Sequence, residues 1–92
     1  MDAANMIVRP VKWHELKTWP EEFGWTISGG KTFELRVNDR GYQSGDVLHL
    51  REWDPTREEY TGRSVSRQVV YILAGGKFGL PENMVIMQLV MV

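Results

Sequence analysis

The stretch LKTWPEEFGWTISGGKTFELR, residues Leu16–Arg36, predicts a passage from strand to helix and back to strand. Thr18 and Glu21 have the spacing of a capping box, and the proline between them is tolerated in the first turn of a helix. Apolar residues then recur at every fourth position, which is typical of one face of a short helix. These residues are Trp19, Phe23 and Ile27. This stretch therefore predicts one short helix immediately after the first strand.

A glycine pair at residues 29–30 ends the helix, because glycine readily adopts the conformation that follows a helix C-terminus. In the strand that follows, Glu34 and Arg36 alternate with apolar residues and share one face. Lys31 stands at the corner before them. These charges fit either a solvated ion pair worth at most about 1 kcal/mol or the lining of a site, and the pattern alone leaves both interpretations open.

The rest of the chain predicts a mainly β fold of the α+β class. Alternating or apolar runs indicate strands at residues 11–19, 31–37, 46–53, 63–73 and 84–92. The last of these is almost entirely apolar, so we expect it to be buried on both faces. Five or six strands and one helix suggest a small β-barrel with the helix packed against it. We assign residues 13–92 to this domain and residues 1–12 to an N-terminal tail or loose strand.

Composition restricts the classes of function. The chain has 92 residues, a net charge of −1 and no cysteine, which suits a single domain in a reducing cytoplasm and excludes thiolate chemistry. Proteins that bind long duplexes usually carry a basic surplus, so any contact with nucleic acid is expected to be local. No apolar run reaches the length of a membrane span, and the N-terminus lacks the features of a signal peptide. We expect no membrane association.

Other motifs give little support for chemistry. GWTISGGKT, residues 24–32, resembles a phosphate-binding loop, but its spacing is one residue too long and a helix precedes it where a strand is required. His14 and His49 have no acidic residue at a familiar ligand spacing, so we expect half-buried strand histidines, no metal and no cofactor. Trp19 and Trp53 fit either stacking on a base or packing in the core.

The segment Leu16–Arg36 resembles the signature of the ASCH domains, in the PUA-like superfamily. The core of that signature is Gly-x-Lys-x-x-Glu-x-Arg, and its four places are filled by Gly29, Lys31, Glu34 and Arg36. HELKTWP, GDVLHLREWDP and YTGR…VVYIL are similar to stretches in an uncharacterised branch of this group from bacteria and phages. The resemblance extends from about residue 13 to residue 91.

The resemblance implies a small β-barrel with a helix at one side and a charged cleft that binds RNA or a nucleotide-like ligand. Lys31 would contact a phosphate or a base acceptor, and Arg36 would bind phosphate or a base edge with two hydrogen bonds. Glu34 would accept from an exocyclic amine or hold Arg36 in place, with Thr32, Trp19 and Trp53 as further candidates. A single-stranded or flipped-out base suits such a cleft better than a duplex. We expect a monomer.

Two alternatives stay open. One ASCH branch resembles an amidohydrolase that acts on acetylated cytidine, with a lysine, a threonine nucleophile at the place of the motif glutamate, and a distant glutamate. Here that place holds Glu34, so Lys31, Thr32 and Glu34 are weak catalytic candidates and Glu82 is the only candidate for the distant acid. The third interpretation is a protein-interaction domain with an exposed apolar patch near Trp53.

Overall fold

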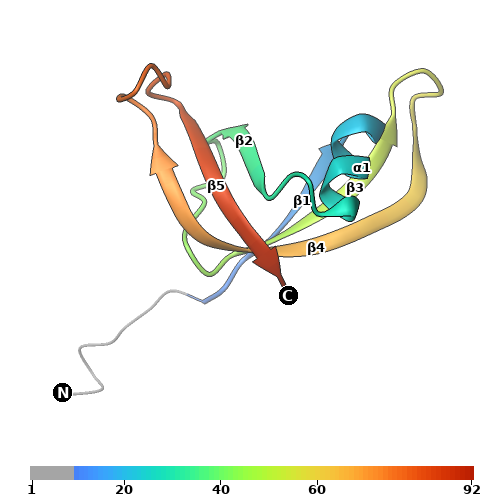
Figure 1. The fold of residues 1–92 in the computed structure, drawn as a ribbon, viewed down its shortest axis with the longest axis horizontal. Coiled ribbons are helices and arrows are strands. Elements are labelled where there is room, and N and C mark those ends of the chain that lie inside the picture. Colours follow the sequence, from blue (N-terminus) through green and yellow to red (C-terminus); the bar gives the residue numbers. More distant parts are fainter. Residues whose placement is uncertain (1–9) are drawn as a thin grey trace.

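The computed structural model of the protein describes residues 10–92. Five strands and one helix follow one another along this range (Figure 1). They are β1 (Trp13–Thr18), α1 (Pro20–Ser28), β2 (Phe33–Val37), β3 (Val47–Asp54), β4 (Glu59–Ala74) and β5 (Met84–Met91). The prediction of a mainly β fold with one short helix after the first strand is confirmed.

All five strands belong to one sheet with the order β1-β3-β4-β5-β2. β1 runs parallel to β3, and the remaining neighbours are antiparallel. β4 is long enough to pair with β3 through residues 59–68 and with β5 through residues 67–74. Its two halves therefore belong to two arms, and the sheet curls into a half-barrel with β1 and β2 at its edges (Figure 1).

The core lies on the inner face of this curled sheet. Its fully buried side chains come from the central strands β3, β4 and β5, with Phe23 contributed by the helix. They are Leu48, Leu50, Val69, Met87 and Phe23. The expectation that β5 is buried on both faces is wrong: Val85, Met87 and Leu89 are buried, whereas Gln88 and Val90 are exposed. Nothing in residues 10–92 covers the outer face of this curled sheet at β5, so burial there follows an alternating pattern.

The helix begins without the predicted cap. Thr18 is the last residue of β1 and is buried, while Trp19 is the N-cap and makes no capping hydrogen bond with its side chain. Trp19 and Ile27 are exposed at 60% and 46%, and the buried residues are Phe23 and Thr26. A step of four residues along a helix advances about 40° beyond a full turn. Trp19 and Ile27 are therefore rotated to either side of Phe23, away from the part of the helix that packs on β3.

The helix ends where the glycine pair predicts. Gly29 has φ = 86°, and its N–H donates to the carbonyl of Thr26. At Gly30 an added Cβ would lie 2.6 Å from the Trp25 ring, so any other residue there would displace this ring from the corner. The Lys31 N–H then donates to the carbonyl of Trp25, which sets the direction of the chain into β2.

Part of the predicted N-terminal segment 1–12, namely residues 1–9, lies outside the described residues. Lys12 is joined to the sheet, because its N–H donates to Asp46 and its carbonyl accepts from Val47. Within residues 10–92, no helix has the length and apolar character needed to cross a membrane.

Candidate functional site

The strand β2 turns its charged side chains inward and its apolar side chains outward. Glu34 is 3% exposed and is paired across the sheet with the core residue Met87. Phe33, Leu35 and Val37 are 43–49% exposed. The solvated ion pair is therefore excluded for Glu34, because its carboxylate lies on the core side of the sheet.

Both oxygens of the Glu34 carboxylate are held by cations. Oε2 lies 2.6 Å from Lys31 Nζ, and Oε1 lies 2.9 Å from Arg36 Nε. The side chains of Lys31 and Arg36 are only 17% and 25% exposed. Lys31 Nζ also donates to the carbonyl of Phe33 at 2.7 Å. We call Lys31, Glu34 and Arg36 the motif triad; its two cations are held in fixed positions and carry one positive charge in excess of the carboxylate.

Arginine side chains span the gap between the two edges of the half-barrel. Arg36 Nη2 donates to the carbonyl of Lys17 at 2.8 Å, and Arg40 Nη1 donates to the carbonyl of Glu15 at 2.9 Å. Both acceptors belong to β1, the edge strand opposite β2. Arg36 therefore joins Glu34 to the main chain of β1, which fixes the position of its guanidinium group.

A cavity of about 450 Å³ lies beside the triad, between the end of β1, the first turn of α1 and β2. We call it the motif cavity. Its lining consists of Lys17, Thr18, Trp19, Glu22, Lys31, Phe33, Glu34, Leu35 and Arg36. Three of these residues are cationic and two are acidic. The buried Thr18 hydroxyl has no hydrogen-bond partner among the described residues, and Trp19 presents an indole that is 60% exposed.

The structure brings four of the predicted site residues together and separates two others. Lys31, Glu34, Arg36 and Trp19 all line the motif cavity. Thr32 instead lines an adjoining cavity, and Gln88 Nε2 lies 3.4 Å from its hydroxyl. Trp53 does not line either cavity.

Trp53 has partners of its own. Lys17 Nζ lies 3.8 Å from the centre of its ring, and the Tyr60 ring packs edge-on at 5.0 Å. Trp53 is half-buried and Trp19 is exposed. Neither tryptophan belongs to the buried core, so the core interpretation is wrong for both, and only Trp19 stands at the motif cavity.

Sequence reasoning missed Lys17, Thr18 and Glu22 as lining residues. Lys17 meets Arg36 through its main-chain carbonyl, which any residue would supply, so its side chain gave no signal. The spacing of Thr18 and Glu21 predicts a helix cap at Thr18, but Pro20 favours an extended conformation at residue 19, which moves the cap to Trp19.

A second buried polar cluster lies apart from the motif triad. His14 is buried, rather than half-buried as expected, and its Nε2 lies 2.8 Å from Asp46 Oδ2, while the ring of Tyr42 packs edge-on at 4.8 Å. Burial raises the pKa of the Tyr42 hydroxyl above its ordinary value. His49 is half-buried, as expected, and lies 3.0 Å from the Ser66 hydroxyl. Residues 10–92 contain no group of three metal-ligating side chains.

The comparisons with known proteins give a family and one relative. The family model described as "Domain of unknown function (DUF3850)" matches residues 13–89. The chain is also 38% identical over 58 residues to the "Uncharacterized 12.9 kDa protein in GpA 3'region" of Escherichia phage P2. That alignment covers 63% of this chain and 51% of the phage protein, so the chain spans about half the length of the curated relative it matches.

Proposed function

We propose that this chain, which belongs to the family of the Domain of unknown function (DUF3850), is an RNA- or nucleotide-binding module whose ligand occupies the motif cavity. We further propose that it is an ASCH domain of the PUA-like superfamily. The four motif residues Gly29, Lys31, Glu34 and Arg36 and the half-barrel with its helix support this relationship.

The observation that carries the proposal is the motif triad beside an exposed indole. Glu34 holds Lys31 and Arg36 in fixed positions, so a phosphate group can bind them without first ordering two long side chains. The excess positive charge favours an anion. Trp19 lines the same cavity and offers a face on which a base can stack.

In this proposal Glu34 is a positioning residue. Both of its oxygens already accept from the cations, so it supports Arg36 and Lys31 rather than accepting from an exocyclic amine. The hydrolase alternative gains no support from this arrangement, because Thr32 and Glu34 line different cavities, with only Lys31 shared between them, and the Glu34 carboxylate is buried between two cations.

The size of the cavity favours one nucleotide at a time. A volume of about 450 Å³ falls within the roughly 300–1,000 Å³ range of small-molecule sites. The chain carries a net charge of −1, which does not favour binding along a duplex. The proposed ligand is therefore a single-stranded or flipped-out nucleotide.

A matched pair of tryptophan variants tests the base-stacking role. Trp19 and Trp13 are 60% and 62% exposed, but Trp13 stands at the start of β1 and lines neither the motif cavity nor the adjoining one. Titration with a fluorescent single-stranded RNA pentamer should show that Trp19→Ala lowers the affinity about tenfold, since base stacking contributes about 1–3 kcal/mol per base. Trp13→Ala should bind within twofold of the wild type.

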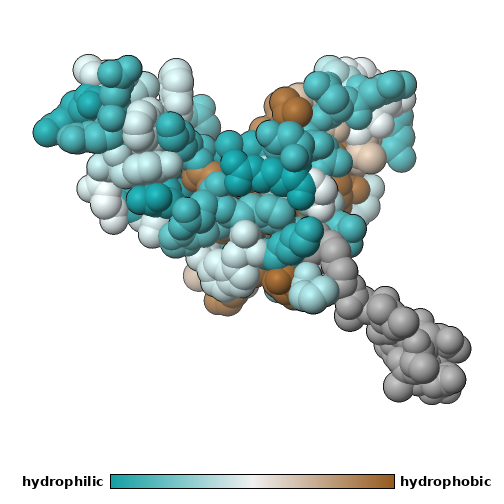
Figure 2. Space-filling model, turned by 180° about the vertical axis from the view of Figure 1, so that it is seen from behind, coloured by the Kyte–Doolittle hydropathy of each residue, from teal (hydrophilic) through white to brown (hydrophobic). Residues whose placement is uncertain are grey.

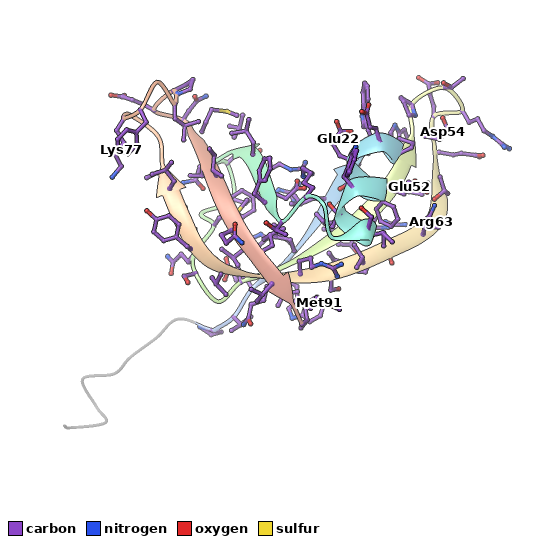
Figure 3. The ribbon with its side chains drawn as sticks, in the orientation of Figure 1. Glu22, Glu52, Asp54, Arg63, Lys77 and Met91 are labelled. Atoms are coloured by element: carbon purple, nitrogen blue, oxygen red, sulfur yellow. The ribbon has the colours of Figure 1, made fainter. Side chains whose placement is uncertain are left out.

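A matched pair of lysine variants tests the charge. Lys31→Gln should weaken RNA binding and reduce the slope of log affinity against log salt by about 0.7, the value for one lost phosphate contact on a single strand. Lys77→Gln removes the same charge from the β4–β5 loop, on the arm opposite α1, and should leave the slope unchanged (Figure 3). Equal effects of the two variants, or no binding of RNA or nucleotides by the folded wild type, would overturn the proposal.

A further inference from the structure

A second cavity adjoins the motif cavity at the other end of the helix. It has a volume of about 580 Å³ and lies between the C-terminal end of α1, Arg67 of β4 and the last residues of β5. Lys31 lines both cavities, so the two are neighbours on either side of this residue. Figure 3 shows labelled members of each lining, Glu22 on α1 and Met91 at the end of β5. We call the second one the helix-end cavity.

Arg67 differs from the other arginines that the structure describes. Those at positions 36, 40, 51, 57 and 63 each have a carboxylate oxygen within 4.0 Å. Within residues 10–92, Arg67 has none; its guanidinium donates to the carbonyls of Ser66 at 3.0 Å and Thr26 at 3.5 Å. A half-buried guanidinium without a counter-charge is costly, and a bound anion would compensate it.

The remaining lining of the helix-end cavity fits a ligand that carries both an anion and an apolar part. Its cations are Arg67 and Lys31, and no acidic residue lines it. The buried hydroxyl of Thr26 has no hydrogen-bond partner within the described residues. On the opposite side, Leu89, Val90 and Met91 supply an apolar wall.

We propose that the helix-end cavity is a second nucleotide subsite, in which Arg67 binds a backbone phosphate and the end of β5 contacts the attached sugar and base. This inference rests on the proposed function and deepens it. Because Lys31 lines both cavities, a single-stranded RNA can pass over residues 29–32 and place one nucleotide in the motif cavity and the next in the helix-end cavity. The preferred ligand is therefore a single strand of at least two nucleotides rather than a free nucleotide.

A purely structural role for Arg67 makes a different prediction. Its contact with the Thr26 carbonyl places a cation near the C-terminus of α1, where it favours the helix. If that were its whole role, Arg67→Gln would lower stability and leave RNA affinity unchanged. Bonds to two carbonyls, at 3.0 and 3.5 Å, use only part of a group with five donors.

The experiment compares uridine 5′-monophosphate with a uridylate pentamer on the full chain, using calorimetry and a salt series. The wild type should bind the pentamer at least tenfold more tightly than the mononucleotide. Arg67→Gln should lower pentamer affinity at least fivefold and change mononucleotide affinity less than twofold. Arg57→Gln, the same change at the exposed end of the β3–β4 hairpin, is the matched control and should change neither affinity.

A second variant keeps the test valid if Arg67→Gln does not fold. Met91 is 79% exposed and lines the helix-end cavity, so Met91→Glu introduces a carboxylate there with little risk to the core. It should weaken pentamer binding about tenfold, whereas Phe78→Glu at the 86% exposed Phe78 should not.

The outcomes separate the two proposals. Pentamer binding that is no tighter than mononucleotide binding, or equal losses for both ligands in Arg67→Gln, would overturn the second subsite and leave the motif cavity as the binding site. Failure of both ligands to bind the folded wild type would overturn the proposed function itself.

Discussion

Replacing Glu34 by glutamine tests whether the motif triad is a buried ionic cluster. Glutamine has nearly the same shape, but it can accept from only one of the two cations and presents its amide nitrogen to the other. Lys31 and Arg36 then lie beside each other without the carboxylate that both contact in the native protein, at 2.6 and 2.9 Å. The expected result is a substantial loss of stability.

The magnitude follows from burial. Removing one partner of a fully buried ion pair costs about 3–5 kcal/mol, because the other charge stays buried and uncompensated. The Lys31 and Arg36 side chains keep 17% and 25% of their exposure, so water relieves part of that cost. We expect a loss of about 2–3 kcal/mol in the free energy of unfolding. For a domain of this size that lowers the melting temperature by roughly 10–20 °C.

Urea unfolding at pH 7, followed by circular dichroism, measures this loss. The matched control is Glu22→Gln: Glu22 lines the same cavity, but it is exposed and forms no ion pair with any residue from 10 to 92. A surface change of this kind should alter stability by less than about 0.5 kcal/mol. If Glu34→Gln were as mild as Glu22→Gln, the triad would be an ordinary solvated cluster and our account of the cavity would fail.

Three further predictions concern the surrounding fold. Because burial raises the pKa of Tyr42 above its ordinary 10.0, the unfolded chain loses the hydroxyl proton first as pH rises. The stability that the neutral Tyr42 hydroxyl gives the folded protein is therefore intact below about pH 10 and is lost at higher pH. Urea unfolding at pH 8 and 11 should therefore show a smaller alkaline loss of stability in Tyr42→Phe than in the wild type, and parallel losses would contradict the assignment. Gly24→Ala should stabilise the protein by about 0.5–1 kcal/mol, since Gly24 is helical with open space around it. Gly29→Ala should destabilise it by about 1 kcal/mol, because φ = 86° is unfavourable for alanine, and thermal melts that rank these two variants in the opposite order would refute the argument.

Local periodicity predicted the elements of the fold but not the direction in which β2 faces. Alternation places Phe33 and Leu35 on one side of the strand and Glu34 and Arg36 on the other, and a hydrophobic rule would bury the first pair. The protein buries Glu34 instead, because Lys31 and Arg36 compensate its charge. That compensation depends on the corner at residues 29–31, which no strand pattern encodes.

The sequence predicted only those parts of the candidate site that consist of side chains in a recognisable pattern. The motif residues and Trp19 gave a recognisable pattern, and they line one cavity. Lys17 contributes a main-chain carbonyl, and Arg67 reaches the helix only because β4 is shared between two arms of a curled sheet. Such contacts arise from the path of the chain and have no local signature.

Apolar side chains remain exposed on the surface of the protein, among them those that β2 turns outward. Seen from behind, the arm with the β3–β4 hairpin is coloured teal to white, whereas brown, hydrophobic residues show on the arm with the β4–β5 loop (Figure 2). Because alternate residues of a strand face opposite sides, burying Glu34 leaves Phe33, Leu35 and Val37 exposed at 43–49%, which costs hydrophobic free energy.

The arginine bridges between β2 and β1 also determine how the barrel can open. Strands joined by a main-chain ladder are held about 4.7–4.9 Å apart, and separating them breaks several hydrogen bonds together. Here Arg36 and Arg40 join the two edges through their side chains, each with one hydrogen bond to a single carbonyl of β1. The edges β1 and β2 can therefore separate when two side-chain hydrogen bonds break, one from Arg36 and one from the more exposed Arg40, and the sheet keeps all five strands.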